Sequence, residues 1–75
     1  MNVRVVLFGL LRQKAGFERG DVELEQGATV ADLLARLGLP DRVDVWALVN
    51  GRRASRDTAL SDGAEVQFFQ PVGGG

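Results

Sequence analysis

The chain has 75 residues, 45% of which are hydrophobic, and carries a net charge of −1. It contains no Cys and no His, which excludes a disulfide framework and the usual thiolate or imidazole metal ligands, so an apolar core has to hold its single domain together. Its Lys and Arg residues are scattered, which argues against nucleic acid as a partner, and no apolar run approaches the roughly 20 residues that span a bilayer. We expect a cytoplasmic protein that binds no nucleic acid, membrane or metal.

The first part of the chain predicts two strands joined by a connection. Residues 2–8 form a strand whose side chains alternate between an inward and an outward set. The outward set is Arg4, Val6 and Phe8. The connection over residues 9–20 is held by apolar anchors, namely Leu10, Leu11, Ala15 and Phe17. Residues 21–25 form the second strand, with Val22 and Leu24 inward and acidic side chains in water.

A helix is predicted over residues 30–37. Thr29 is suited to cap it, with Asp32 as the acid of a short capping box. One apolar stripe follows from the spacing i, i+3, i+4 and i+7, formed by Val30, Leu33, Leu34 and Leu37. Gly38 ends the helix because glycine takes the left-handed conformation without a Cβ clash.

The second half predicts three strands around a tight turn. Residues 45–49 are a continuous apolar run, typical of a central strand that is buried on both faces. Asn50 and Gly51 close a hairpin, so residues 52–54 return beside the preceding strand. The chain then crosses to a last strand over residues 65–69, and Leu60 is the apolar side chain by which this connection packs on the core. The order indicates an α+β fold in which one main helix packs across a mixed sheet.

Apolar side chains that point away from the core indicate a partner surface. Alternation places Phe69 outward on the last strand and Phe8 outward on the first. If these strands are neighbours, the two rings form an exposed apolar patch, which usually marks a binding site. The alternative is that Phe17 covers the patch. Arg52 and Arg53 are interpreted as solvated hairpin residues, with pairing to acids on a partner as the alternative.

The segment after the last strand has a different character. We divide the chain into a domain of residues 1–70 and a flexible tail of residues 71–75, because Pro71 cannot donate to a sheet ladder and glycines carry high backbone entropy. Tail residues Pro71, Val72, Gly73, Gly74 and Gly75 make a thin thread that reaches roughly 16 to 18 Å when extended. Without His, Cys or Tyr, the common bases and nucleophiles are absent, which leaves the carboxylate of Gly75. A disordered or cloning-derived tail is the alternative.

Five segments together resemble the MoaD/ThiS family of sulfur carriers. They are VRVVLFGLLRQ, GATVADLLARL, ALVNGR, LSDGAEVQFFQPV and the terminal GG. The resemblance implies a β-grasp, ubiquitin-like fold in a protein that is not itself an enzyme and binds no cofactor. It implies that an ATP-dependent, ubiquitin-activating-like adenylyltransferase forms a glycyl-adenylate at Gly75, which then becomes 1-thioglycine, and that Gly74 precedes it to keep access open.

The tail is more similar to that of the molybdopterin synthase small subunit than to that of the thiamine carrier. This similarity implies a sulfur carrier for molybdenum or tungsten cofactor assembly, whose tail enters the large subunit of molybdopterin synthase. A carrier for the thiazole of thiamine or another thiolated metabolite, with thiazole synthase as partner, is one alternative. A ubiquitin-like binding module or protein modifier is another.

Overall fold

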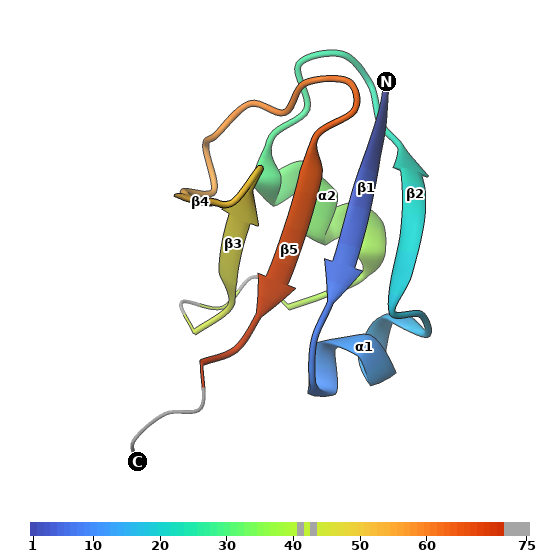
Figure 1. Ribbon diagram of the computed structural model, residues 1–75, viewed down its shortest axis with the longest axis vertical. Coiled ribbons are helices and arrows are strands. Elements are labelled where there is room, and N and C mark those ends of the chain that lie inside the picture. The colour runs from blue at the N-terminus through green and yellow to red at the C-terminus, as the bar shows by residue number, and fades with distance from the viewer. Residues whose placement is uncertain (41, 43, 72–75) are drawn as a thin grey trace.

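The computed structural model describes residues 1–40, 42 and 44–71. A five-stranded sheet has the order β2-β1-β5-β3-β4 (Figure 1). Its strands are β1 (Asn2–Leu7), β2 (Arg19–Glu23), β3 (Trp46–Val49), β4 (Arg52–Ala54) and β5 (Glu65–Phe69), and the helices are α1 (Leu10–Ala15) and α2 (Val30–Leu37). In the described part of the chain no helix is long and apolar enough to cross a membrane.

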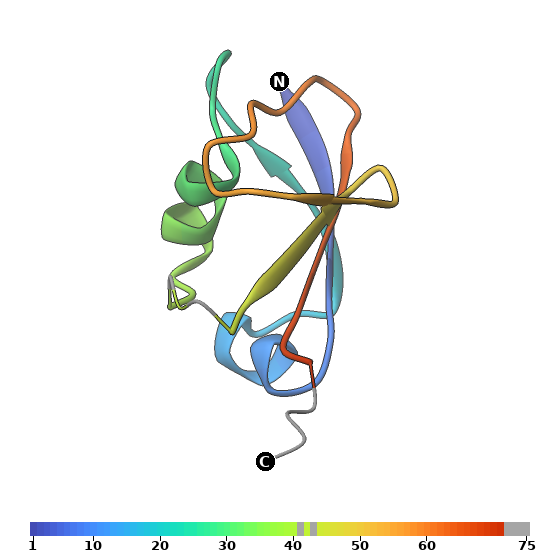
Figure 2. The same ribbon diagram turned by 90° about the vertical axis from the view of Figure 1, so that its left-hand side faces the viewer.

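The centre of the sheet is the parallel pair of the first and last strands. In this pair Val5 lies opposite Val66 and Leu7 opposite Phe68. The other pairings, β1 with β2, β3 with β4 and β3 with β5, are antiparallel. The sheet is therefore mixed, and α2 lies across one face while the described elements leave the other face open (Figure 2). This is the predicted β-grasp arrangement.

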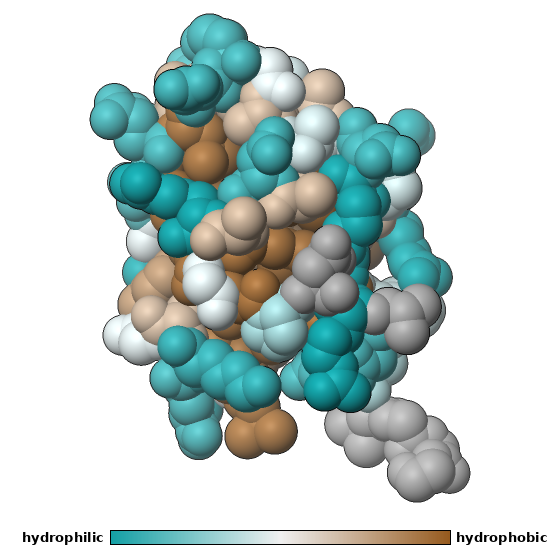
Figure 3. Space-filling view, turned by 180° about the vertical axis from the view of Figure 1, so that it is seen from behind, coloured by the Kyte–Doolittle hydropathy of each residue, from teal (hydrophilic) through white to brown (hydrophobic). Residues whose placement is uncertain are grey.

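The core lies between α2 and the inward side chains of the sheet. Phe68, Val5 and Leu33 are fully buried there and belong to one apolar cluster. Viewed from the α2 side, apolar residues gather in the middle and hydrophilic residues surround them (Figure 3). Of the apolar stripe predicted for the helix, Val30, Leu33 and Leu34 are buried, so the helix provides one wall of the core.

Local signals at the turns are confirmed. The Oγ1 of Thr29 accepts from the backbone N–H of Asp32 at 3.3 Å, and the Oδ2 of Asp32 accepts from the backbone N–H of Thr29 at 2.9 Å, which closes the capping box. Gly38 takes the left-handed conformation at φ 70°. Asn50 and Gly51 both have positive φ, 51° and 83°, as a two-residue hairpin turn needs.

The connection predicted over residues 9–20 was wrong in two respects. Part of it is the helix α1, in which Leu11 is buried at 1% exposure while Leu10 is 63% exposed and anchors nothing. The strand β2 also begins at Arg19, before the predicted start at residue 21, because residues 19 and 20 already pair with β1. Tertiary pairing thus converts the end of the connection into strand.

The prediction that residues 45–49 are buried on both faces was also wrong. Val45 and Ala47 are buried, whereas Trp46 and Leu48 are half-buried on the open face of the sheet. Val6, in contrast, is more buried than its outward position predicts. It lies on the open face as predicted but is only 4% exposed, so this face is partly apolar at its centre.

Candidate functional site

The last strand leads directly to the tail, of which only Pro71 belongs to the described residues and is exposed. The remaining predicted carrier and tail residues, Val72, Gly73, Gly74 and Gly75, lie outside the described residues. The site is therefore built here from the base of the tail and from the surface around it.

The base of the tail is held by the side chain of Gln70, the residue that precedes Pro71. Gln70 donates from Nε2 to Oδ2 of Asp44 at 3.2 Å, and Arg42 donates from Nε to Oδ1 of the same carboxylate at 3.2 Å. Asp44 lies in the segment between α2 and β3, so the hydrogen bond from Gln70 ties the end of β5 to a different part of the chain, and Arg42 holds the Asp44 carboxylate within that segment. A residue before proline is also restricted to extended backbone. Both constraints limit the direction in which the chain leaves the domain.

Three aromatic side chains, Phe8, Phe69 and Trp46, lie on the open face beside this base; we call them the aromatic row. Phe8 follows the pair of Leu7 with Phe68, and its backbone N–H donates to the carbonyl of Phe68 at 3.3 Å. Phe69 pairs with Trp46 across β5 and β3, and their ring centroids are 5.9 Å apart at 51°. The predicted neighbours Phe8 and Phe69 are therefore brought to the same end of the same face.

Within the aromatic row Phe8 is exposed, whereas Phe69 and Trp46 are half-buried. Phe8 is 47% exposed, and among the described residues only Leu10 is another large apolar side chain with comparable exposure. Phe17 does not cover it. The ring of Phe17 packs against the core cluster and fills the space beside Gly20, which pairs with the core-facing Val5. The alternative that Phe17 closes the patch is wrong, because Phe17 lies on the helix side of the sheet.

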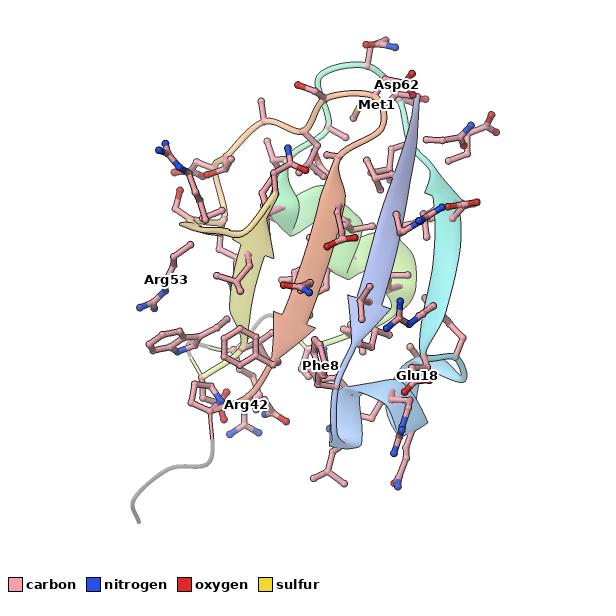
Figure 4. The ribbon with its side chains drawn as sticks, in the orientation of Figure 1. Met1, Phe8, Glu18, Arg42, Arg53 and Asp62 are labelled. Carbon is pink, nitrogen blue, oxygen red and sulfur yellow. The ribbon has the colours of Figure 1, made fainter. Side chains whose placement is uncertain are left out.

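Trp46, and the contact that brings Arg53 to it, were missed as parts of this surface. The guanidinium carbon of Arg53 lies 3.3 Å from the ring centroid of Trp46, within reach of a cation–π interaction. Figure 4 shows Arg53 and Arg42 on the β3–β4 side and Phe8 near the ends of β1 and β5. The sequence did hold one signal, because tryptophan is large and seldom fully buried. Its presence within residues 45–49 argues against a strand that is buried on both faces.

The described residues contain no group of three or more acidic, Cys or His side chains placed to hold a metal ion. The geometry offers instead an apolar surface next to an anchored strand end. Such an arrangement can dock on a partner and bring the end of the last strand against it.

Comparison with known proteins gives consistent relatives. The model of the ThiS family matches residues 5–75. Among solved structures, a Pyrococcus furiosus protein assigned as subunit 1 of a molybdopterin converting factor is 35% identical with a TM-score of 0.83, over 96% of this chain and 99% of that one. The small archaeal modifier protein SAMP1 of Haloferax volcanii is 29% identical with a TM-score of 0.83, over the whole of both chains.

A thiamine biosynthesis protein, ThiS, of Geobacter metallireducens is 25% identical with a TM-score of 0.66, over the whole of both chains. Comparison with curated proteins finds no match. The related structures thus include proteins named for a pterin pathway, a thiamine pathway and a protein modifier.

Proposed function

Because the chain belongs to the ThiS family and has the ubiquitin-like fold of ThiS and MoaD sulfur carriers, we propose that it carries sulfur on the carboxyl group of Gly75. The observation that carries this proposal is the extent of the family match, which runs to residue 75 and so includes the glycines of the tail. The chemistry belongs to partner enzymes, and this chain is their protein substrate.

The proposed reaction begins with activation, since a carboxylate is a poor electrophile. In an adenylyltransferase of the ubiquitin-activating kind, the carboxylate of Gly75 attacks the α-phosphorus of ATP and pyrophosphate leaves. A sulfide nucleophile then attacks the acyl carbon, AMP leaves, and the product is the thiocarboxylate 1-thioglycine. Gly73 and Gly74 keep the thread free of any Cβ, which lets it enter a narrow channel.

The described residues have two roles in this scheme. The aromatic row of Phe8, Phe69 and Trp46 docks on the partner, because an exposed apolar surface gains free energy when it is covered. The hydrogen bond from Gln70 to Asp44 holds the strand end, so less freedom is lost when the tail enters the partner. Pro71 and Val72 then pass along the partner's surface toward its active site.

For the sulfur acceptor we propose the molybdopterin precursor, with this chain as the small subunit of molybdopterin synthase. The support is the 35% identity with the Pyrococcus furiosus protein, against 25% with the Geobacter metallireducens ThiS. A protein modifier is a second candidate, favoured by the full-length match to SAMP1 with a TM-score of 0.83.

Reconstitution tests the carrier chemistry. The protein is incubated with ATP, a purified adenylyltransferase of this kind and a sulfide donor, and its intact mass is measured. We expect the mass increase of one oxygen-to-sulfur exchange, located at Gly75 by fragmentation. A variant with one leucine added after Gly75 is the control and should stay unmodified because a side chain obstructs the thread. Equal modification of both proteins, or modification of neither, contradicts the proposal.

The acceptor is tested with the loaded protein. The thiocarboxylated chain is mixed with the large subunit of molybdopterin synthase and the pterin precursor, or in parallel with thiazole synthase and its substrates. We expect sulfur transfer in the first mixture. Transfer only in the second would assign the thiamine pathway, and isopeptide bonds between Gly75 and lysines of other proteins, found by peptide mass mapping, would assign the modifier role.

A further inference from the structure

A basic hollow lies beside the aromatic row, at the β4 edge of the sheet. It has a volume of about 320 Å³ and is lined in part by Arg42, Arg53, Arg56 and Trp46. None of its lining residues is acidic, whereas a larger hollow over β1, β2 and β5 has Arg4 together with Asp21 and Glu65. The hollow is therefore positively charged, although the chain as a whole has a net charge of −1.

Two of the three arginines already have protein partners in the structure. Arg42 pairs with Asp44 at 3.2 Å. Arg56 donates to the carbonyl oxygens of Arg42 and Val45 at 2.6 and 2.8 Å, which fixes one wall of the hollow. Arg53 differs, because it takes part in none of the ion pairs found among the described residues.

Arg53 is also oriented for recognition. Its guanidinium lies over the ring of Trp46 at 3.3 Å, so one face of the plane is covered by the indole. The N–H groups of a guanidinium lie in its plane, and a stacked guanidinium keeps them free to bind a carboxylate with two parallel hydrogen bonds. The stacking restricts the side chain before binding, which lowers the entropy lost on contact.

We propose that the hollow binds an acidic side chain, Asp or Glu, of the protein that covers the aromatic row. Trp46 belongs to both features, so a partner that packs on Phe69 and Trp46 also brings its surface to Arg53. The aromatic row supplies apolar contact area and Arg53 supplies selection for an acidic partner. The proposal rests on the proposed function for the identity of the partner, but the recognition of a carboxylate is tested without it.

Arg52 and Arg53 make a matched pair for this test. Arg53 pairs with Leu48 across the hairpin and shares the open face with Trp46, whereas Arg52 pairs with Val49, which packs against the core cluster. Arg53→Glu and Arg52→Glu change the net charge by the same amount on neighbouring exposed residues. A difference between the two variants therefore reports position and not overall charge.

The probe is a synthetic peptide with four Glu residues around one Leu, and the control peptide has Gln in place of each Glu. The signal is the fluorescence of Trp46, which is the only tryptophan of the chain, supported by amide chemical-shift changes in NMR spectra. We expect a saturable change with the Glu peptide and none with the Gln peptide. The affinity should fall when salt is raised from about 0.05 to 0.5 M, because exposed charges are screened.

In the variants, Arg53→Glu should weaken binding of the Glu peptide at least about tenfold, and Arg52→Glu should leave it within about twofold of the original protein. Arg53→Gln, which keeps a polar side chain of similar length, is the second variant and should also lose binding. Equal losses in the Arg52 and Arg53 variants, or equal responses to the two peptides, would overturn the proposal. The binding experiment uses no ATP and no activating enzyme. A result that overturns the carboxylate site would therefore leave the proposed carrier function untouched.

Discussion

Leu7 and Phe8 are consecutive residues with opposite exposure, and replacing each with alanine separates folding from partner binding. Leu7 is 1% exposed within the core, whereas Phe8 is 47% exposed on the open face. Leu7→Ala should therefore reduce the free energy of unfolding, and Phe8→Ala should mainly reduce the affinity for the adenylyltransferase. The two effects follow from the alternation of side chains along β1, which Phe8 continues by one residue beyond the strand's end.

The magnitudes follow from the buried and exposed areas. Truncation of a buried leucine costs about 2 to 5 kcal/mol, and a small domain has little stability to lose. A phenylalanine presents about 200 Å², so the 47% exposure of Phe8 leaves roughly 95 Å² for a partner to cover. At about 25 cal/mol per Å² full coverage of this area is worth at most about 2.4 kcal/mol, or about 50-fold in affinity, because ordering costs offset part of it. The stability cost of Phe8→Ala should stay near 1 kcal/mol.

Urea unfolding followed by circular dichroism measures stability, and isothermal titration calorimetry with the adenylyltransferase measures affinity. Leu10→Ala is the matched control, because Leu10 is 63% exposed but belongs to α1 and not to the aromatic row. It should change neither quantity appreciably. If Phe8→Ala bound with unchanged affinity, or destabilised the fold as much as Leu7→Ala, the assignment of this face to a partner would be refuted.

Two further substitutions test the local contacts. Thr29→Ala removes the acceptor for the backbone N–H of Asp32 and should cost about 1 kcal/mol, or about 4 to 8 °C in Tm by calorimetry; an unchanged Tm would mean that the capping box does not stabilise α2. Gln70→Ala removes the hydrogen bond to Asp44 and should raise the KM for adenylation by up to about fivefold with little change in Tm. Gln13→Ala, at an exposed position of α1, is its control, and equal KM values for the two variants would exclude a role for the anchored strand end.

The elements that could be predicted from sequence have local causes. The capping box of Thr29 and Asp32 and the turn at Asn50 and Gly51 involve residues within one helical turn or hairpin. Their hydrogen bonds and φ angles therefore depend little on the rest of the chain. The core stripe of α2 follows in the same way from the helical period.

The helix α1 was missed because it has no comparable signal. Its N-cap is Gly9, which forms no side-chain capping hydrogen bond, and the helix has only six residues. An isolated helix of this length is marginal in water. Burial of Leu11 against the core holds it, and that contact exists only once the sheet has formed.

The sequence by itself determined which side chains alternate and therefore placed Phe8 and Phe69 outward, because the period of a strand is a property of its backbone. It did not determine that Trp46 and Arg53 complete that surface. An apolar run such as residues 45–49 has no internal mark that tells a covered face from an open one. Only the tertiary structure decided this, since α2 covers one side of the sheet and Arg53 comes to Trp46 through the pairing of β3 with β4.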